Sequence, residues 1–263
     1  MGRFSSLELD QSQKEEEIQL SEKESFGDKP RNASYFIDIA MQEYYLANYE
    51  KAMQLFSKAL NFEPSNKTAW ILQVRCLIHL SEFKEASMWA DKGMQLLGED
   101  PEMMAAKAMA LCRMGDFSRA YGLSDVSIGF TGDDPFVWMS RGEILLHQKK
   151  SNSEFCFQKA ISAAGSSWEI HLEIARIYQF YGLTHKALAI LEDAASGNPS
   201  KAGIWFELGN CFRKMGMKEK SLQAYSTALQ IEPKFEMAKK AMPAVRNMGF
   251  LESLKVRLFG NKF

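Results

Sequence analysis

Cysteine and histidine are the side chains best suited to hold a metal ion or to supply a nucleophile and a base, and the chain has four of each. No two cysteines are closer than 36 residues, so the CxxC pair of zinc and redox sites is missing. The histidines show no HExxH motif and no other metal-ligand spacing. The sequence therefore predicts no metal and no cofactor. The residues concerned are Cys76, Cys112, Cys156, Cys211, His79, His147, His171 and His185.

Motifs that mark catalytic sites are missing as well. The sequence contains no GxSxG nucleophile motif, no phosphate-binding Walker A loop and no GxGxxG dinucleotide motif. We therefore expect no catalytic residue and predict that the chain is not an enzyme.

Composition and charge narrow the class of protein further. Of the 263 residues 46% are hydrophobic and 25% charged, as in a soluble globular protein. Lys and Arg number 32 against 33 Asp and Glu, and this balance argues against nucleic-acid binding, which usually needs a basic excess. Scattered cysteines are typical of buried thiols in a reducing compartment. No signal peptide or membrane-spanning run is recognisable, so we predict a cytoplasmic protein.

The elements that must position any functional side chain repeat about every 34 residues. One column of this repeat stops helices: Pro64, Gly98, Gly132, Gly165, Pro199 and Pro233. A second is small: Ala40, Val74, Ala108, Gly142, Ala175 and Gly209. A third is large and mostly aromatic: Phe36, Trp70, Met104, Trp138, His171 and Trp205. A fourth is again small: Ala52, Ala86, Ala120, Ser153, Ala187 and Ser221. Four columns with one period indicate an internal structural repeat.

Each unit is expected to hold two amphipathic helices of about 13 residues joined by a short turn. In the last unit the first helix has one face at the spacing i, i+3, i+4 and i+7, formed by Trp205, Leu208, Gly209 and Phe212. The second helix turns Ser221, Tyr225, Ala228 and Leu229 inward. Small residues are expected where two helices approach closely.

The residues of this last unit resemble the tetratricopeptide repeat. The matching motif is Trp205-x-x-Leu208-Gly209-x-x-Phe212, then Ser221-x-x-x-Tyr225, then Pro233. The resemblance implies an all-α fold: a right-handed superhelical solenoid of about six antiparallel helix pairs with a C-terminal capping helix. The units are placed at 33–66, 67–100, 101–134, 135–167, 168–201 and 202–235. The ending GFLESLKVRLFGNKF suggests a family member of bacterial type.

Two segments lie outside the repeat. Residues 1–32 carry eight acidic and five basic residues and few large apolar ones, which predicts a mobile acidic tail. Residues 236–263 are expected to form a capping helix, interrupted by Pro243, and then a basic amphipathic segment. We expect 236–248 to cap the last unit and 250–263 to contact a partner or a membrane surface.

Family resemblance implies that the first helix of each unit lines a concave groove. By position, the candidate partner-binding residues are Met41, Tyr44, Tyr45, Arg75, His79, Met109, Arg113, Met139, Arg176, Phe206, Asn210 and Arg213. Met and aromatic side chains suit the binding of an apolar segment. Packing between neighbouring helices is the alternative for part of this stripe. We expect Tyr45, Arg75, Arg176, Asn210 and Arg213 to be exposed in the groove.

A second periodic set is polar where the family usually has Leu: Gln73, Lys107 and Arg141. A buried unpaired polar group is costly, so these side chains should reach solvent or pair with acidic neighbours. A polar stripe for a partner is the other interpretation.

These features predict a protein-interaction scaffold that binds a peptide or helix of a partner protein in its groove. A chaperone for a secretion or assembly system, and a membrane-peripheral assembly factor, are the alternatives. Some members of the family clamp the C-terminal carboxylate of heat-shock chaperones with Lys and Asn. Here Ile37 and Met41 occupy those positions, so we expect no such clamp. Oligomeric state is left open by the sequence.

Overall fold

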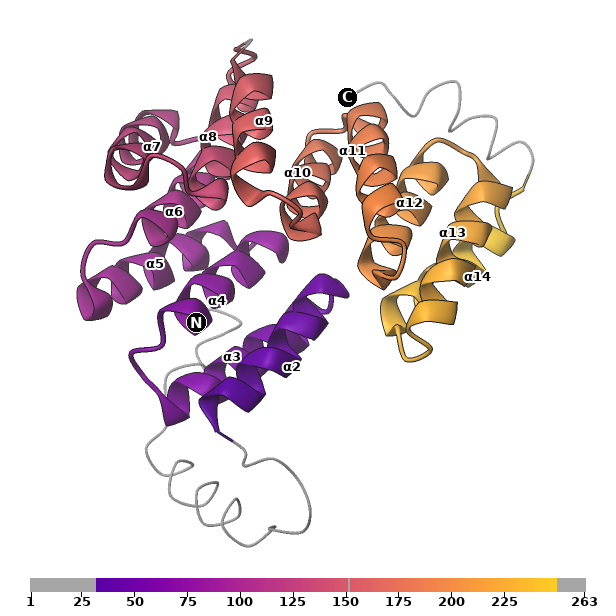
Figure 1. Cartoon of the computed structure of the whole chain (residues 1–263), viewed down its shortest axis with the longest axis horizontal. Helices are drawn as coiled ribbons and strands as arrows, with labels where there is room; N and C mark the ends of the chain where they lie inside the picture. The colour runs from indigo at the N-terminus through magenta and orange to yellow at the C-terminus, as the bar shows by residue number, and fades with distance from the viewer. Residues whose placement is uncertain (1–31, 151, 250–263) are drawn as a thin grey trace, which may run out of the picture. The chain divides into compact units, whose positions relative to one another are not determined.

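All regular structure in the computed structural model, which describes residues 32–150 and 152–249, is helical (Figure 1). The helices are α2 Ala33–Tyr45, α3 Tyr49–Phe62, α4 Lys67–His79, α5 Phe83–Leu97, α6 Pro101–Arg113, α7 Phe117–Thr131, α8 Pro135–His147, α9 Ser153–Ala164, α10 Trp168–Phe180, α11 Thr184–Gly197, α12 Ala202–Lys214, α13 Lys218–Ile231 and α14 Glu236–Arg246. From α4 to α12, the first helices of successive pairs begin 34, 34, 33 and 34 residues apart. The predicted all-α fold of helix pairs is confirmed.

The chain divides into two compact units. The first unit contains Met1–Tyr44 and Asn48–Gly132, and the second contains Tyr45–Ala47 and Asp133–Phe263. In the first unit α4 packs on α5 and α6 on α7; in the second, α8 packs on α9, α10 on α11 and α12 on α13. Successive pairs also touch, since α5 packs on α6 and α11 on α12. Each unit therefore obtains its core by stacking helix pairs.

Helix starts follow the same period as the helix stops. Asn66, Asp100 and Asp134 precede α4, α6 and α8, and each side chain accepts a hydrogen bond from the backbone N–H three residues later. These caps satisfy a donor that the helix itself leaves free. Gly98 and Gly132, which end α5 and α7, have φ angles of 84° and 57°, where glycine is least strained. The predicted stops at both glycines are confirmed.

Small residues lie where the two helices of a pair touch, as predicted. In the second unit, a Cβ atom added to Gly209 of α12 would lie 2.5 Å from the ring of Tyr225 on α13. A Cβ atom on Gly142 of α8 would lie 2.6 Å from the ring of Phe157 on α9. Both distances are far below van der Waals contact, so the aromatic ring occupies the volume that glycine leaves free.

Two tryptophans of the large column make the same hydrogen bond in the two units. The indole N–H of Trp70 donates to the carbonyl of Pro64 at 2.8 Å, and that of Trp205 donates to the carbonyl of Pro199 at 2.7 Å. In each case the acceptor lies between one helix pair and the next. The tryptophan therefore fixes this connection while its ring packs against neighbouring side chains.

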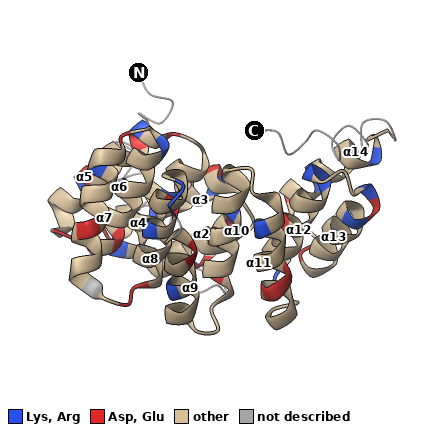
Figure 2. Cartoon of the chain, turned by 90° about the horizontal axis from the view of Figure 1, so that it is seen from above, with Lys and Arg blue, Asp and Glu red and all other residues tan. Residues whose placement is uncertain are grey.

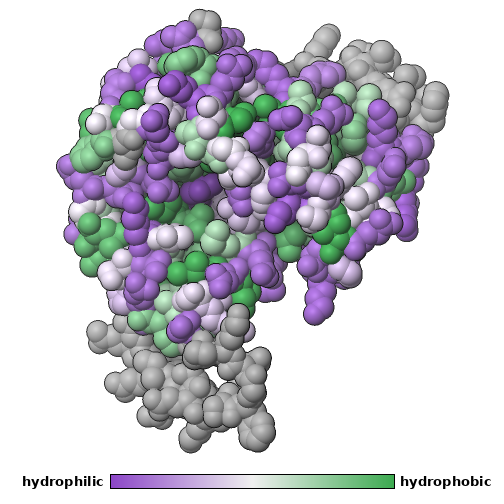
Figure 3. All heavy atoms as spheres, viewed as in Figure 1, coloured by the Kyte–Doolittle hydropathy of each residue, from purple (hydrophilic) through white to green (hydrophobic). Residues whose placement is uncertain are grey.

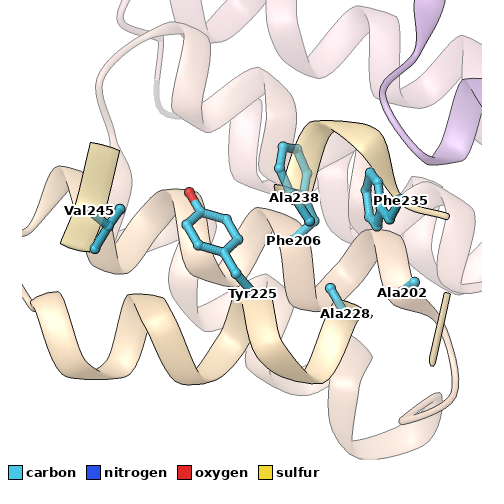
Figure 4. Packing of buried hydrophobic residues seen from close by; sticks show 7 residues of the cluster. All are labelled: Ala202, Phe206, Tyr225, Ala228, Phe235, Ala238 and Val245. Carbon is cyan, nitrogen blue, oxygen red and sulfur yellow. The ribbon is translucent and has the colours of Figure 1, made fainter. Parts of the chain in front are cut away.

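Helix α14 covers the apolar face of α12 and α13, which confirms the predicted capping helix. The cluster in Figure 4 contains Ala202, Phe206, Tyr225, Ala228, Phe235, Ala238 and Val245. Met237, Ala241 and Met242 pack against it. The expected interruption at Pro243 is wrong, because α14 continues to Arg246 through it. Pro243 removes one backbone hydrogen bond, the one that residue 243 would donate to residue 239, and the residues that follow it remain helical to Arg246. The segments 1–31 and 250–263, with the predicted tail and amphipathic helix, lie outside the described residues.

The polar column behaves differently at its two positions in the first unit. Lys107 is paired with Asp91 at 2.5 Å, as expected for a charge that cannot be buried alone. Gln73 is 1% exposed, and neither its amide nitrogen nor its amide oxygen has a hydrogen-bond partner. The expected pairing or solvation is therefore wrong for Gln73, because Trp70, Leu77 and other apolar residues of α4 are buried around the same helix.

Replacing Gln73 by Leu is expected to stabilise the chain. The substitution removes two unsatisfied buried polar groups, which should raise the free energy of unfolding by about 1–3 kcal/mol. Urea unfolding followed by circular dichroism measures the change. Lys107→Leu is the matched control at the equivalent position of the next helix pair, and it should give no gain because it breaks an ion pair. Lower stability in Gln73→Leu would contradict the prediction.

Candidate functional site

A cluster of aromatic and cationic side chains lies on the first helices of the first unit. The Tyr44 hydroxyl on α2 lies 2.9 Å from Nε2 of His79 in the last turn of α4. The ring of Tyr49, at the start of α3, stacks on His79 with a centroid distance of 4.4 Å and an angle of 6°. The Arg75 guanidinium, one turn before His79, lies 5.4 Å from the centre of the Tyr44 ring. The His79 imidazole therefore contacts two tyrosine side chains, and Arg75 places a cation beside one of them.

The cluster contains one buried residue, which supports the others, and three partly exposed residues. Tyr44 is fully buried, so it positions His79 and does not itself contact solvent. Arg75, His79 and Tyr49 are partly exposed. Met41, one turn before Tyr44, is also partly exposed. This leaves a surface with an apolar thioether, an imidazole and a guanidinium, a combination that suits an apolar segment carrying a carboxylate.

The same pattern continues in the next pair of helices. Arg113 ends α6 at the repeat position of His79, and its guanidinium lies 5.9 Å from the centre of the Phe83 ring. Arg113 and Phe83 are partly exposed, whereas Met109 on α6 is only 4% exposed. Met109 therefore packs in the core of the first unit. Tyr49, Phe83 and Phe117 begin the second helices and recur every 34 residues, a signal in the sequence that could have pointed to this aromatic edge.

In the second unit, a buried ion-pair network replaces the exposed arginine that we expected. Arg176 on α10 is 6% exposed. Its Nη1 donates to Glu173 and its Nε to Glu207 of α12, both at 2.9 Å. The predicted exposure of Arg176 is therefore wrong, because the buried carboxylates of Glu173 and Glu207 hold its guanidinium between α10 and α12. The sequence analysis missed both acidic partners. Glu173 lies three residues before Arg176, and Glu207 lies on the first helix of the next pair.

The network extends from Glu207 towards solvent through Asn210. The Asn210 amide donates to Glu207 at 2.9 Å, and its Oδ1 accepts from the hydroxyl of Tyr225 at 2.7 Å. Burial raises the pKa of Tyr225, so this phenol stays protonated and can donate. Asn210 is partly exposed and Arg213 fully so.

The other candidate residues of the second unit are structural. Met139 on α8 is fully buried, and Phe206 on α12 is 5% exposed within the cluster of Figure 4. The ring of Tyr45 lies 4.9 Å from that of Trp168, and its carbonyl accepts from Nη2 of Arg176 at 3.2 Å. Partial burial of Tyr45 leaves some of its surface accessible.

The described structure supports neither a reactive cysteine thiolate nor a metal site. Cys76, Cys112, Cys156 and Cys211 are free and buried. Burial raises the pKa of Cys211 to about 12, and it also raises the pKa of Cys156, so neither is a thiolate at neutral pH. Among residues 32–150 and 152–249 no group of three or more His, Cys, Asp or Glu side chains is placed to hold a metal ion.

A family model described as "Tetratricopeptide repeat" matches residues 202–235, which contain the whole of α12 and α13. The other helix pairs repeat this element at the same spacing. The chain is a tetratricopeptide-repeat protein. Repeats of this kind stack so that each helix pair contacts only its neighbours.

Two curated relatives match part of this tetratricopeptide-repeat protein. It is 28% identical to "Tetratricopeptide repeat protein 4" of Homo sapiens over 88 residues. The aligned segment covers 34% of this chain and 23% of the relative. It is 33% identical to "Outer dynein arm-docking complex subunit 4" of Xenopus laevis over 79 residues. The aligned segment covers 30% of this chain and 15% of the relative. The match therefore spans less than a quarter of either relative.

The crystal structure of a tetratricopeptide repeat protein from Parabacteroides merdae has the same fold. Its TM-score is 0.50 at 16% sequence identity, and the alignment covers 90% of this chain and 92% of that one. At this identity the similarity concerns the fold alone. No helix in the described part of this tetratricopeptide-repeat protein is both long and apolar enough to cross a membrane.

Proposed function

We propose that this protein is a non-enzymatic scaffold that binds a short peptide or helix of a partner protein through the first helices of its first unit. The binding surface consists of the partly exposed residues Met41, Arg75, His79 and Arg113. Met41 supplies an adaptable apolar contact, and the two guanidinium groups and the imidazole favour a carboxylate next to it. The preferred ligand is therefore an apolar segment with a neighbouring acidic side chain.

The observation that carries this proposal is the support beneath the surface residues. His79 is held by the hydroxyl of Tyr44 on one helix and by the ring of Tyr49 on the next. Arg75 and Arg113 each lie over an aromatic ring of the preceding helix pair. Side chains fixed in this way lose little entropy when a ligand binds, which favours recognition by a preorganised surface.

A chaperone role is less well supported by the described residues. A chaperone for aggregation-prone clients would need a broad apolar surface, whereas two of the four residues of this site are arginines. Four free cysteines are typical of a reducing compartment, so we place the scaffold in the cytoplasm. The balanced charge of the chain argues against nucleic acid as the partner.

Peptide selection with point variants tests the site. Peptides selected from a random display library on the full chain should bind with an affinity that falls at least about tenfold in Met41→Glu and in His79→Ala, as expected for central contacts. Isothermal titration calorimetry measures the affinity, and circular dichroism checks folding.

His147→Ala is the matched control for this experiment. His147 occupies the repeat position of His79, ends α8 in the second unit and is exposed. Its removal should leave peptide affinity unchanged. An equal loss of peptide affinity in His79→Ala and His147→Ala, or an unchanged affinity in Met41→Glu, would place the binding site elsewhere.

A further inference from the structure

Five basic residues gather at one end of the last three helices. Arg213 and Lys214 end α12, Lys218 and Lys220 begin α13, and Arg246 ends α14. The ends meet in space, because Nζ of Lys218 donates to the backbone carbonyl of Arg246 at 2.6 Å and to that of Met248 at 2.9 Å. We call these five residues the basic end. Figure 2 shows Lys and Arg in blue on these helices.

The basic end has little opposing charge. Residues 202–249 contain eight Lys or Arg and four Glu, and Glu207 is already paired with Arg176. Glu219 is the acidic residue within the basic end, and Glu236 pairs with Lys239 at the other end of α14. None of the five basic residues forms an ion pair within the described ranges 32–150 and 152–249. An uncompensated positive potential therefore remains at this surface.

The positions of two lysines strengthen this potential. Lys218 and Lys220 lie in the first turn of α13, where the helix dipole is positive and disfavours a cation. The ammonium group of Lys220 lies 5.5 Å from the centre of the Phe212 ring, and this cation–π contact holds the charge at the start of α13. Backbone and side-chain charge thus have the same sign here, which favours a polyanion.

The apolar side chains exposed near the basic end decide which kind of anionic partner fits it. A membrane-docking helix needs an exposed apolar face beside its basic residues. The large hydrophobic residues that are exposed in the described structure all lie before α11, namely Phe62, Met88, Leu96, Met114, Val126, Phe130, Phe155 and Phe180. Figure 3 shows hydrophilic residues along the edge over α13 and α14. A partner that offers charge alone suits this end better than a lipid surface.

We propose that the basic end is a second docking surface, which binds an acidic segment of a partner protein independently of the site in the first unit. Carboxylates of this segment pair with Lys214, Lys220, Arg213 and Arg246. Lys218 keeps its role in holding the C-terminal carbonyls of α14. Binding of this kind is driven by charge, so it weakens as salt rises.

A fluorescein-labelled deca-glutamate peptide is a direct probe of this surface. Fluorescence anisotropy on the full chain should show binding that weakens strongly between about 50 and 300 mM salt, because the Debye length falls over this range. Lys214→Glu with Lys220→Glu should reduce the affinity at least about tenfold, since both attraction is lost and repulsion is added. Lys214→Arg with Lys220→Arg keeps the charge and should bind as the unaltered chain does.

Lys239→Glu with Lys240→Glu is the matched control, because it changes the net charge equally on the same unit. Both lysines are exposed on α14, about 10 Å along the helix axis from Arg246. This variant should retain most of the affinity, and circular dichroism should show all variants folded. Equal loss in both reversal variants, binding that is insensitive to salt, or sedimentation with phosphatidylserine vesicles without peptide binding would overturn the proposal.

Discussion

Gly209→Leu is expected to unfold the last helix pairs at a temperature well below that of the unaltered chain. Even one added carbon atom would lie 2.5 Å from the Tyr225 ring. That ring is fully buried, and its hydroxyl is fixed by Asn210, so it has no space to move into. Overpacking of this kind costs about 1–3 kcal/mol or more. Because neighbouring pairs share interfaces, the loss should spread to α14 and its cluster.

Thermal and urea unfolding followed by circular dichroism measure this effect. Gly122→Leu is the matched control, since Gly122 lies inside α7 and a Cβ atom there would meet nothing within 4 Å. It should be neutral or slightly stabilising, because glycine is a poor helix former. A Gly209→Leu variant as stable as the unaltered chain would contradict the tight contact between α12 and α13.

Removal of the Arg176 guanidinium is expected to have the second large effect. Arg176→Met leaves the carboxylates of Glu173 and Glu207 buried without their cation, and these two residues are 3% and 4% exposed. Breaking a buried pair by removing one partner costs about 3–5 kcal/mol. The unfolding midpoint in urea should fall accordingly.

Two further variants show whether the cause is the unpaired charge. Arg213→Met removes an exposed arginine three residues beyond Asn210 and should change stability little. Arg176→Met combined with Glu173→Leu and Glu207→Leu replaces both buried ion pairs by apolar groups and should recover most of the loss. A single Arg176→Met variant that unfolds like Arg213→Met would mean that the network contributes nothing measurable.

The sequence alone determined the helices and their pairing. Helix boundaries depend on local chemistry: caps such as Asn66 and Asp100, stops such as Gly98, and apolar faces with a period of 3.6 residues. The small residue at Gly209 also followed from the repeat, because a small residue recurs at this position every 33 or 34 residues. Cysteine burial was also predictable, because thiols scattered along a helical chain usually pack as small hydrophobic side chains.

Tertiary structure alone decided which residues at equivalent repeat positions face solvent. Arg75 and Arg176 occupy the same repeat position, yet Arg75 is partly exposed and Arg176 is buried. The difference arises from Glu173, one turn earlier on α10, and from Glu207 on α12 of the next helix pair, which together neutralise Arg176. Periodicity gives the direction of a side chain but not the charge that it meets there. Only packed neighbours determine whether an arginine is a binding group or part of the core.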